Sequence, residues 1–270
     1  MADTPTLRTW YLATNRNGLL RAFDQIQVAV VSARQHTSLS PVCLVDHGDD
    51  VAGVARQLDW LRARGVRLIF HRSSLLADLR GHYGSLMDAF SGHWLRCDIP
   101  MIETDEQFVL YTDIDVMFSG PVGDNSVWPR YIACGPEHHR DDASYFNSGV
   151  MVMNLPNLRA RLPDLADTIR RRFDTARAHD DQGALNELFR DEWDWLAPAW
   201  NWKPYWGRYN GARIVHFHGP KPALARHMLL GRQPAVVGEM AEIFNRNPAG
   251  YAYYTERFFA HLRAAEAMPC

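Results

Sequence analysis

The first part of the chain alternates between short apolar runs and longer amphipathic stretches. Apolar runs at 9–14, 41–46 and 66–70 predict buried strands. The segments between them, through about residue 35 and over 51–65, predict helices. Strands and helices that alternate in this way are typical of a parallel, doubly wound sheet, whose ligands bind at the carboxyl ends of the strands. We therefore expect an α/β fold.

The rest of the chain continues the alternation. The pattern predicts a helix near 85–98, strands at 107–113, 130–137, 146–155 and 213–217, and helices at about 157–177, 181–190 and 250–267. Trp, Tyr and Pro are dense over 193–210, which predicts irregular structure. No internal repeat, low-complexity tract or linker is visible, so we expect a single domain over residues 1–270.

Two acids interrupt one of these apolar runs. In "VLYTDIDVMF" Asp113 and Asp115 stand two residues apart at the end of the strand predicted over 107–113. Side chains two apart on an extended strand point to the same side, so both carboxylates should project together. They repel each other unless a cation lies between them. The pattern indicates a site for a hard divalent ion, Mg²⁺ or Mn²⁺, that could also bind phosphate oxygens; a solvated strand end is the alternative.

Composition and charge exclude several classes. The formal net charge is −2 and the 27 arginines are scattered among acids, so nucleic-acid binding has no electrostatic support. The four cysteines form no close pair, which favours free thiols and a cytoplasmic location. The first residues do not read as a signal peptide and no apolar stretch is long enough to span a bilayer, so we expect at most peripheral membrane contact. The oligomeric state is left open.

Six segments in order resemble a known family. They are "YTDIDVMF", "YFNSGVMVMNL", "HDDQGALNEL" and "HFHGPKP", preceded by "ATNRNG" and "HWLRCDIPMI". Together they are similar to the family-eight, glycogenin-like retaining glycosyltransferases. The resemblance runs from residue 9 to about 222. It implies a GT-A fold, a Rossmann-like mixed sheet flanked by helices, with a nucleotide-binding part at about 1–118, a donor-sugar and acceptor part at 119–222, and a C-terminal helical extension over 223–270.

The resemblance also implies a site, residue by residue. Asp113, Asp115 and His216 match the metal ligands; a neutral imidazole suits Mn²⁺, although a buried strand-end histidine is the alternative. The residues that match the donor-binding positions are Thr14, Asn15, Asn17, Arg96, Asp113, Ile114, Asp115, Asn147, Gly149, Gly219 and Lys221. Asn15 stands where an aspartate is usual, and one residue rather than two separates Gly219 from Lys221. The resemblance implies that "ATNRNG" is a nucleotide-binding loop, although "NRNG" would suit an ordinary turn as well. A surface ion pair is the alternative for Arg96.

The implied reaction is transfer of a sugar from a nucleotide diphosphate, with a UDP-sugar as the expected donor, to a glycan or small hydroxyl acceptor. Asp181, Gln182 and Lys221 match the residues around the reacting carbon and the leaving phosphate. An amide is a poor nucleophile, so we expect substitution on the same face of the sugar without a covalent enzyme intermediate. The alternative for "DQGALNELF" is an Asp181 helix cap with a solvated neighbour.

Three other features have a structural interpretation as well as a functional one. "PEHHRDD" brings together His138, His139, Asp141 and Asp142, but consecutive residues rarely converge on one ion, which favours a mobile polar loop. "WNWKPYWGRY" could stack a sugar on Trp202, Tyr205 or Trp206, or could be structural. Tyr251, Tyr254, Phe258 and Leu262 recur at helical spacing, which favours a packing face over a membrane stripe.

Two other classes are weighed against glycosyl transfer. "FVLYTDIDV" also satisfies the start of a haloacid-dehalogenase-like phosphatase, with Asp113 as nucleophile and Asp115 as acid. The strand-ending acid pair that such an enzyme needs after a late lysine is missing beyond Lys221. A catalytically silent sugar-nucleotide binder is the third class, and the intact acid pair, His216 and Asp181 argue against it.

Overall fold

The computed structural model describes residues 5–48, 50–84, 87–122, 127–172, 180–232 and 238–268, with the side chains of 87–89 left aside. Its strands are β1 Thr9–Asn15, β2 Ser40–Asp46, β3 Arg67–Phe70, β4 Phe108–Thr112, β5 Val116–Phe118, β6 Ile132–Pro136, β7 Phe146–Asn154, β8 Asp194–Trp195 and β9 Ile214–His216. The helices are α1 Arg16–Arg21, α2 Phe23–His36, α3 Ala55–Ala63, α4 Leu76–Tyr83, α5 Met87–Trp94, α6 Ile99–Ile102, α7 Leu155–Arg172, α8 Asp181–Leu188, α9 Pro222–Leu229, α10 Glu239–Arg246 and α11 Pro248–Glu266. Short 3₁₀ turns occupy Ala52–Val54, Leu95–Asp98, Pro198–Asn201 and Pro204–Trp206.

The main sheet is mixed. Its order is β3-β2-β1-β4-β7-β6-β8, in which β3, β2, β1 and β4 run parallel and β7 runs antiparallel to β4 and β6. The parallel half confirms the doubly wound start, and the whole sheet with its flanking helices confirms the α/β class. A second, two-stranded sheet pairs β5 with β9.

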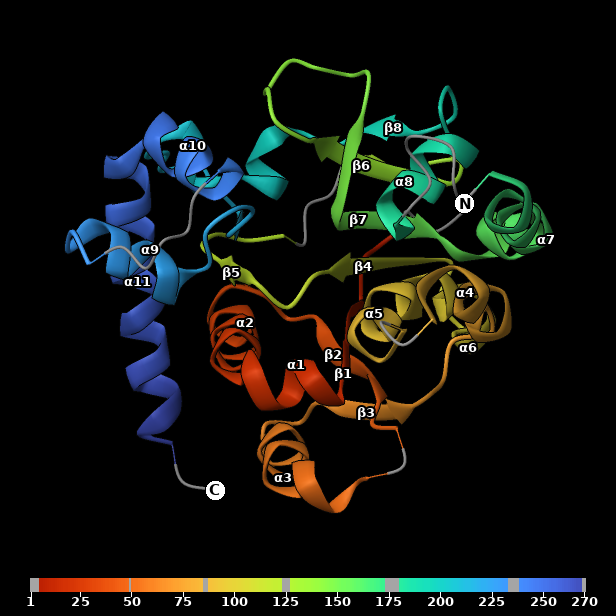
Figure 1. The fold of residues 1–270 in the computed structure, drawn as a ribbon, viewed down its shortest axis with the longest axis horizontal. Helices are drawn as coiled ribbons and strands as arrows, with labels where there is room; N and C mark the ends of the chain where they lie inside the picture. The colour runs from red at the N-terminus through yellow and green to blue at the C-terminus, as the bar shows by residue number, and fades with distance from the viewer. Residues whose placement is uncertain are drawn as a thin grey trace.

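Alternate residues of the central strands feed two cores. Trp10, Leu12 and Leu110 face one cluster, whereas Tyr11 and Tyr111 face the other. Both faces are covered, because the period of two sends apolar side chains each way and every residue of β1, β4 and β7 is buried. Figure 1 shows α1 and α2 beside the end of the sheet that holds β1, β2 and β3, α3 below β3, and α9 to α11 gathered on one flank, away from α7.

The C-terminal helix packs as predicted. Tyr251, Tyr254 and Phe258 of α11 are buried, and Leu262 packs partly buried beside them. The α11 helix contacts α2 and α9, so this face is a packing face. Among the described residues, α11 included, no helix has the length and apolar character to cross a bilayer.

Several boundaries differ from the prediction. The sequence pattern did not resolve α4, and α9 and α10 were predicted only as part of a helical extension. The segment "ATNRNG" was expected to form a loop, but β1 runs directly into α1 because the Asn15 side chain accepts a hydrogen bond from Gly18 N at 2.9 Å and caps the helix. Part of the helix predicted over 157–177 and the free thiol at Cys270 lie outside the described residues; Cys43, Cys97 and Cys134 are buried and free.

Candidate functional site

A cleft of about 600 Å³ brings most of the predicted site residues together. It opens where the carboxyl ends of β1 and β4 meet the amino end of β7. The predicted residues that line it are Thr14, Asn15, Asn17, Arg96, Asp113, Ile114, Asp115, Asn147, Asp181, Gln182, His216 and Lys221. Gly149 and Gly219 are not among the lining residues.

The two acids do not lie on one extended strand, which corrects the sequence argument for their direction. Asp113 follows the last residue of β4, and the chain bends at 114–115 before β5 begins at Val116. The bend still brings the carboxylates together, because Asp113, Asp115 and His216 offer ligand atoms that all lie within 4.8 Å of one another. The register of β5 and β9 places His216 opposite Val116, next to Asp115 in sequence.

Two buried amides set the orientation of His216. Nδ1 of His216 lies 3.1 Å from Oδ1 of Asn147 and 3.1 Å from Oδ1 of Asn201. Both atoms are acceptors, so Nδ1 must carry the hydrogen and donate it. Nε2 then presents its lone pair 3.3 Å from Oδ1 of Asp115 and 3.9 Å from Oδ2 of Asp113. A lone pair facing two carboxylates needs a cation, and an imidazole that donates its other N–H to an oxygen is the usual arrangement of a metal ligand.

Gly149 is required at this point for space. A Cβ on Gly149 would lie 2.2 Å from Cε1 of His216 and 2.9 Å from Oδ2 of Asp113. Without that Cβ, β7 approaches the ring, while Gly149 O accepts a hydrogen bond from Asp113 N at 2.8 Å. The residues present therefore fit a divalent ion such as Mn²⁺ or Mg²⁺: two carboxylates, one oriented imidazole and the space that Gly149 leaves beside them.

Lys221 reaches the same group despite the shortened spacing after Gly219. Its ammonium donates to Oδ2 of Asp115 and, at 3.1 Å, to the Phe217 carbonyl. Burial would raise the pKa of Asp115, but the charge of the Lys221 ammonium holds that pKa well below its usual range. Asp115 is therefore an anion in this cleft.

Arg96 joins the acid pair to α8. Its Nη2 donates to Oδ1 of Asp113 at 2.6 Å, and its Nη1 donates to the carbonyl and hydroxyl of Ser148 at 2.8 and 3.0 Å. Nε lies 2.9 Å from Oδ2 of Asp181, although its hydrogen points to the His93 carbonyl. Burial by itself would lower the pKa of Arg96, but the neighbouring carboxylates of Asp113 and Asp181 raise it by more. This buried side chain is therefore a permanent cation.

The alternative interpretation of Asp181 as a helix cap is wrong. Asp180 is the cap of α8, because its side chain accepts from Gly183 N at 2.5 Å. Asp181 is buried in the cleft wall, and burial raises its pKa. Gln182 next to it is also ordered: Oε1 accepts from Ser148 N at 2.9 Å, and Nε2 donates to Glu137 Oε2 at 3.0 Å.

The predicted aromatic residues and Gly219 do not line the main cleft. Trp202 is buried and packs against Trp206 and Tyr209, so it is structural. Tyr205 and Trp206 line a separate depression beside His138 and not the main cleft. Gly219 has φ +90° and packs where a Cβ would meet Ile243 at 2.7 Å, so a side chain is excluded there.

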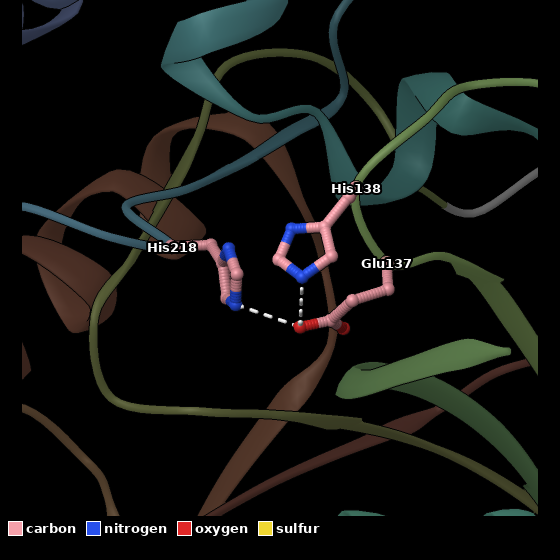
Figure 2. A group of neighbouring side chains, drawn as sticks. All are labelled: Glu137, His138 and His218. Carbon is pink, nitrogen blue, oxygen red and sulfur yellow. Dashed lines mark ion pairs between the residues drawn. The ribbon is translucent and has the colours of Figure 1, made fainter. Parts of the chain in front are cut away.

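Glu137 is the residue that sequence reasoning missed in "PEHHRDD". Glu137 Oε1 lies 2.8 Å from Nε2 of His218, which links this stretch to the segment after β9, and His138 completes the group (Figure 2). His139, Asp141 and Asp142 do not join it. Burial would raise the pKa of Glu137, but hydrogen bonding and charge from His218 and the charge of Lys203 lower it to about 2. Burial also lowers the pKa of His218.

Comparison with solved structures identifies the fold. The chain is 18% identical to the galactosyltransferase LgtC, solved with donor and acceptor sugar analogues, with a TM-score of 0.67 and coverage of 97% of each chain. A variant of LgtC described as an active-site glutamine-to-glutamate mutant matches at 17% identity, TM-score 0.67 and the same coverage. The glycosyltransferase GlyE of Streptococcus pneumoniae matches at 18% identity and TM-score 0.60, over 96% of this chain but only 64% of GlyE. The fold is therefore that of the GT-A glycosyltransferases.

The family follows from the sequence. Residues 94–223 match the model of glycosyl transferase family 8, and over this segment, which holds the acid pair, α8 and His216, the chain belongs to that family. No curated protein sequence matches significantly. This match favours glycosyl transfer over the phosphatase alternative.

Proposed function

We propose that the protein is a metal-dependent retaining hexosyltransferase that uses a UDP-sugar donor and a glycan or other small hydroxyl acceptor. The observation that carries the proposal is the imidazole of His216, oriented by two amides so that Nε2 faces Asp113 and Asp115 in the cleft. The solved relative LgtC is described as a galactosyltransferase, and its structure was obtained with donor and acceptor analogues, which supports the donor and acceptor classes.

Asp113, Asp115 and His216 would hold the metal, which when bound neutralises charge on the donor's diphosphate. Lys221 lies beside Asp115 with an ammonium that can also contact the departing phosphate. Thr14 and Asn15 at the end of β1 and Asn17 in α1 line the same cleft together with Ile114, and we propose that they lie on its nucleotide side. We propose that Gly219 contributes through its backbone, since its conformation and packing exclude a side chain.

The donor sugar would lie between α8 and the start of β7. Arg96, Asp181 and Asn147 present charges and an amide to that space, and these groups suit sugar hydroxyls. Gln182 is held by Ser148 N and Glu137, so its amide has a fixed orientation in the cleft, and we propose that it lies nearest to the reacting carbon. In the proposed step the bond from C1 to the phosphate oxygen breaks with its electron pair, and the acceptor oxygen bonds to C1 on the same face. The acceptor's proton passes to the departing phosphate oxygen.

We also propose that residues 1–270 act as one domain, with nucleotide binding at about 1–118, donor-sugar and acceptor binding over 119–222, and a helical extension at 223–270. The contacts of α11 with α2 support this organisation, because they tie the extension to the nucleotide side.

The test is thermal unfolding with UDP, GDP and ADP, each with and without Mn²⁺. We expect stabilisation by UDP only when Mn²⁺ is present, and loss of that effect in Asp115→Ala. Asp105→Ala is the matched control, because Asp105 is an exposed acid just before β4. Equal stabilisation by UDP without metal would refute the metal assignment, and a β-linked product from an α-linked donor, read by NMR, would refute retention.

A further inference from the structure

Glu137, His138 and His218 form a second cluster of ligand atoms beside the main cleft. Glu137 and His138 follow β6, whereas His218 follows β9, so the cluster exists only in the folded chain. Figure 2 shows the three side chains pointing toward one another, with Glu137 Oε1 2.8 Å from Nε2 of His218 and 4.0 Å from Nε2 of His138. One ligand atom from each residue lies within 4.8 Å of the other two.

The two oxygens of Glu137 have separate partners. Oε2 accepts from Nδ2 of Asn147 at 2.8 Å and from Nε2 of Gln182 at 3.0 Å. Oε1 faces the two imidazoles. A ligand on Oε1 would therefore leave the contacts that hold Asn147 and Gln182 intact.

The environment of His218 allows metal binding through Nε2. Nε2 lies 2.8 Å from Glu137 Oε1 and donates its hydrogen to that oxygen in the absence of a metal. The hydroxyl of Tyr205 lies 2.9 Å from the Glu137 carbonyl and 3.3 Å from Nδ1 of His218, and its single hydrogen is donated to the closer carbonyl. The Tyr205 oxygen can therefore accept a hydrogen from Nδ1 once a metal ion takes the place of the hydrogen on Nε2.

His138 supplies the third donor. Its Nδ1 is buried with no hydrogen-bond partner in the part of the chain that the structure describes. Its Nε2 is on the side of Glu137, and the ring centroid lies 5.5 Å from that of His218.

We propose that Glu137, His138 and His218 bind a transition-metal ion of the Zn²⁺ class, at a site distinct from the group formed by Asp113, Asp115 and His216. Two imidazoles and one carboxylate are a ligand set that Zn²⁺ prefers, whereas a hard ion such as Mg²⁺ prefers oxygen ligands. Bonds of roughly 2.1 Å in tetrahedral geometry require donor atoms about 3.4 Å apart. The observed separations from Glu137 Oε1, 2.8 Å to His218 Nε2 and 4.0 Å to His138 Nε2, fall on either side of that value, and each differs from it by about 0.6 Å.

The site has an open position. Glu137 and His218 line the main cleft, while His138 lines the adjoining depression with Tyr205, Trp206 and Arg246. Three protein ligands leave the fourth tetrahedral position to water or to a ligand in either space. The proposal does not depend on the donor, the acceptor or the metal of the proposed glycosyl transfer.

The experiment measures Zn²⁺ binding to the chelator-stripped full chain without nucleotide, by competition with a chromophoric chelator. We expect His138→Ala to weaken this binding at least tenfold, whereas His139→Ala, which removes the exposed neighbouring histidine outside the cluster, leaves it unchanged. Asp115→Ala should also retain the site. Co²⁺ in place of Zn²⁺ should give the intense visible absorption of tetrahedral coordination in the wild type and in Asp115→Ala.

Each result of these binding measurements either supports or overturns the proposed Zn²⁺ site. His218→Gln gives a second test that keeps a polar side chain, and far-ultraviolet circular dichroism verifies that each variant is folded. The proposal is overturned if His138→Ala binds Zn²⁺ as tightly as His139→Ala, or if Asp115→Ala abolishes all Zn²⁺ binding. Loss of UDP binding in Asp115→Ala with Zn²⁺ binding retained would support two independent sites.

Discussion

Replacing Gly149 with alanine is expected to displace His216 from the proposed metal site. The new Cβ would stand 2.2 Å from Cε1 of His216, and ordinary contact begins near 3.4 Å, so the ring must move by 3.4 − 2.2, about 1.2 Å. Metal–ligand distances tolerate changes of only about 0.2 Å. The imidazole therefore leaves the ion, and its hydrogen bonds to Asn147 and Asn201 break.

The loss of metal affinity determines how much ligand-induced stabilisation the variant loses. Loss of an outer-shell partner of a metal ligand already costs roughly 10- to 100-fold in affinity, so loss of the ligand should cost at least tenfold. With Mn²⁺–UDP at about 100 times the wild-type dissociation constant, ligand-induced stabilisation is about 2.7 kcal/mol; a tenfold weaker variant retains about 1.4 kcal/mol. Overpacking by itself should cost about 1–3 kcal/mol of folding free energy, visible without ligand.

The assay is denaturant unfolding with and without Mn²⁺–UDP. The matched control is Gly81→Ala, because a Cβ on Gly81 of α4 meets nothing within 4 Å. Gly81→Ala should keep the full ligand-induced stabilisation, and its intrinsic stability should be equal or higher. If Gly149→Ala also keeps the full 2.7 kcal/mol, His216 does not bind the metal and the orientation argument fails.

Three further predictions concern the buried charges and one helix cap. Arg96→Gln leaves Asp113 and Asp181 without their cation and should lower the free energy of unfolding by roughly 3 kcal/mol in a urea titration. Burial lowers the pKa of Lys203 from its ordinary value of 10.5 to about 7, so between these two pH values the side chain takes up a proton on unfolding, which favours the unfolded state. The free energy of unfolding of the wild type should therefore rise by about 2 kcal/mol from pH 7 to 9. Lys203→Met should lack this rise. Asp180→Ala should lower stability by about 1 kcal/mol in the same titration.

A specific result would contradict each of these three predictions. An Arg96→Gln protein as stable as the wild type would mean that the carboxylates are already solvated or protonated. A pH profile of Lys203→Met parallel to that of the wild type would show that the buried ammonium keeps its ordinary pKa. Asp191→Ala, an exposed acid just beyond α8, is the control for the cap, and equal losses in both variants would remove the capping argument.

The sequence predicted the parts of the fold that depend on local pattern. The strands β1, β2 and β4 are apolar runs buried on both faces, and their limits were close to those observed. The helix α4 was missed because its apolar residues do not form a regular face, and only Leu79 is buried among its residues. The bend at 114–115 was missed because an acid pair at strand spacing gives no sign of a turn.

The candidate site was predicted where a motif contains its residues and missed where partners come from distant segments. Asp113, Asp115 and His216 were found from motif order. Asn201, which helps to orient His216, lies in the irregular aromatic stretch, and nothing in the neighbouring letters marks its amide. Glu137 was passed over because its partner His218 lies beyond β9, and such pairings depend on tertiary structure.

The pairing of β5 with β9 has a consequence for biosynthesis. The acids precede β5, whereas the imidazole ends β9, and the ribosome makes that strand only after the whole of β6 to α8. A nascent or truncated polypeptide that stops before His216 would carry both aspartates and still be unable to complete the ion's coordination. Binding of the proposed metal ion would thus require that translation has passed β9 and that β5 and β9 have paired in register.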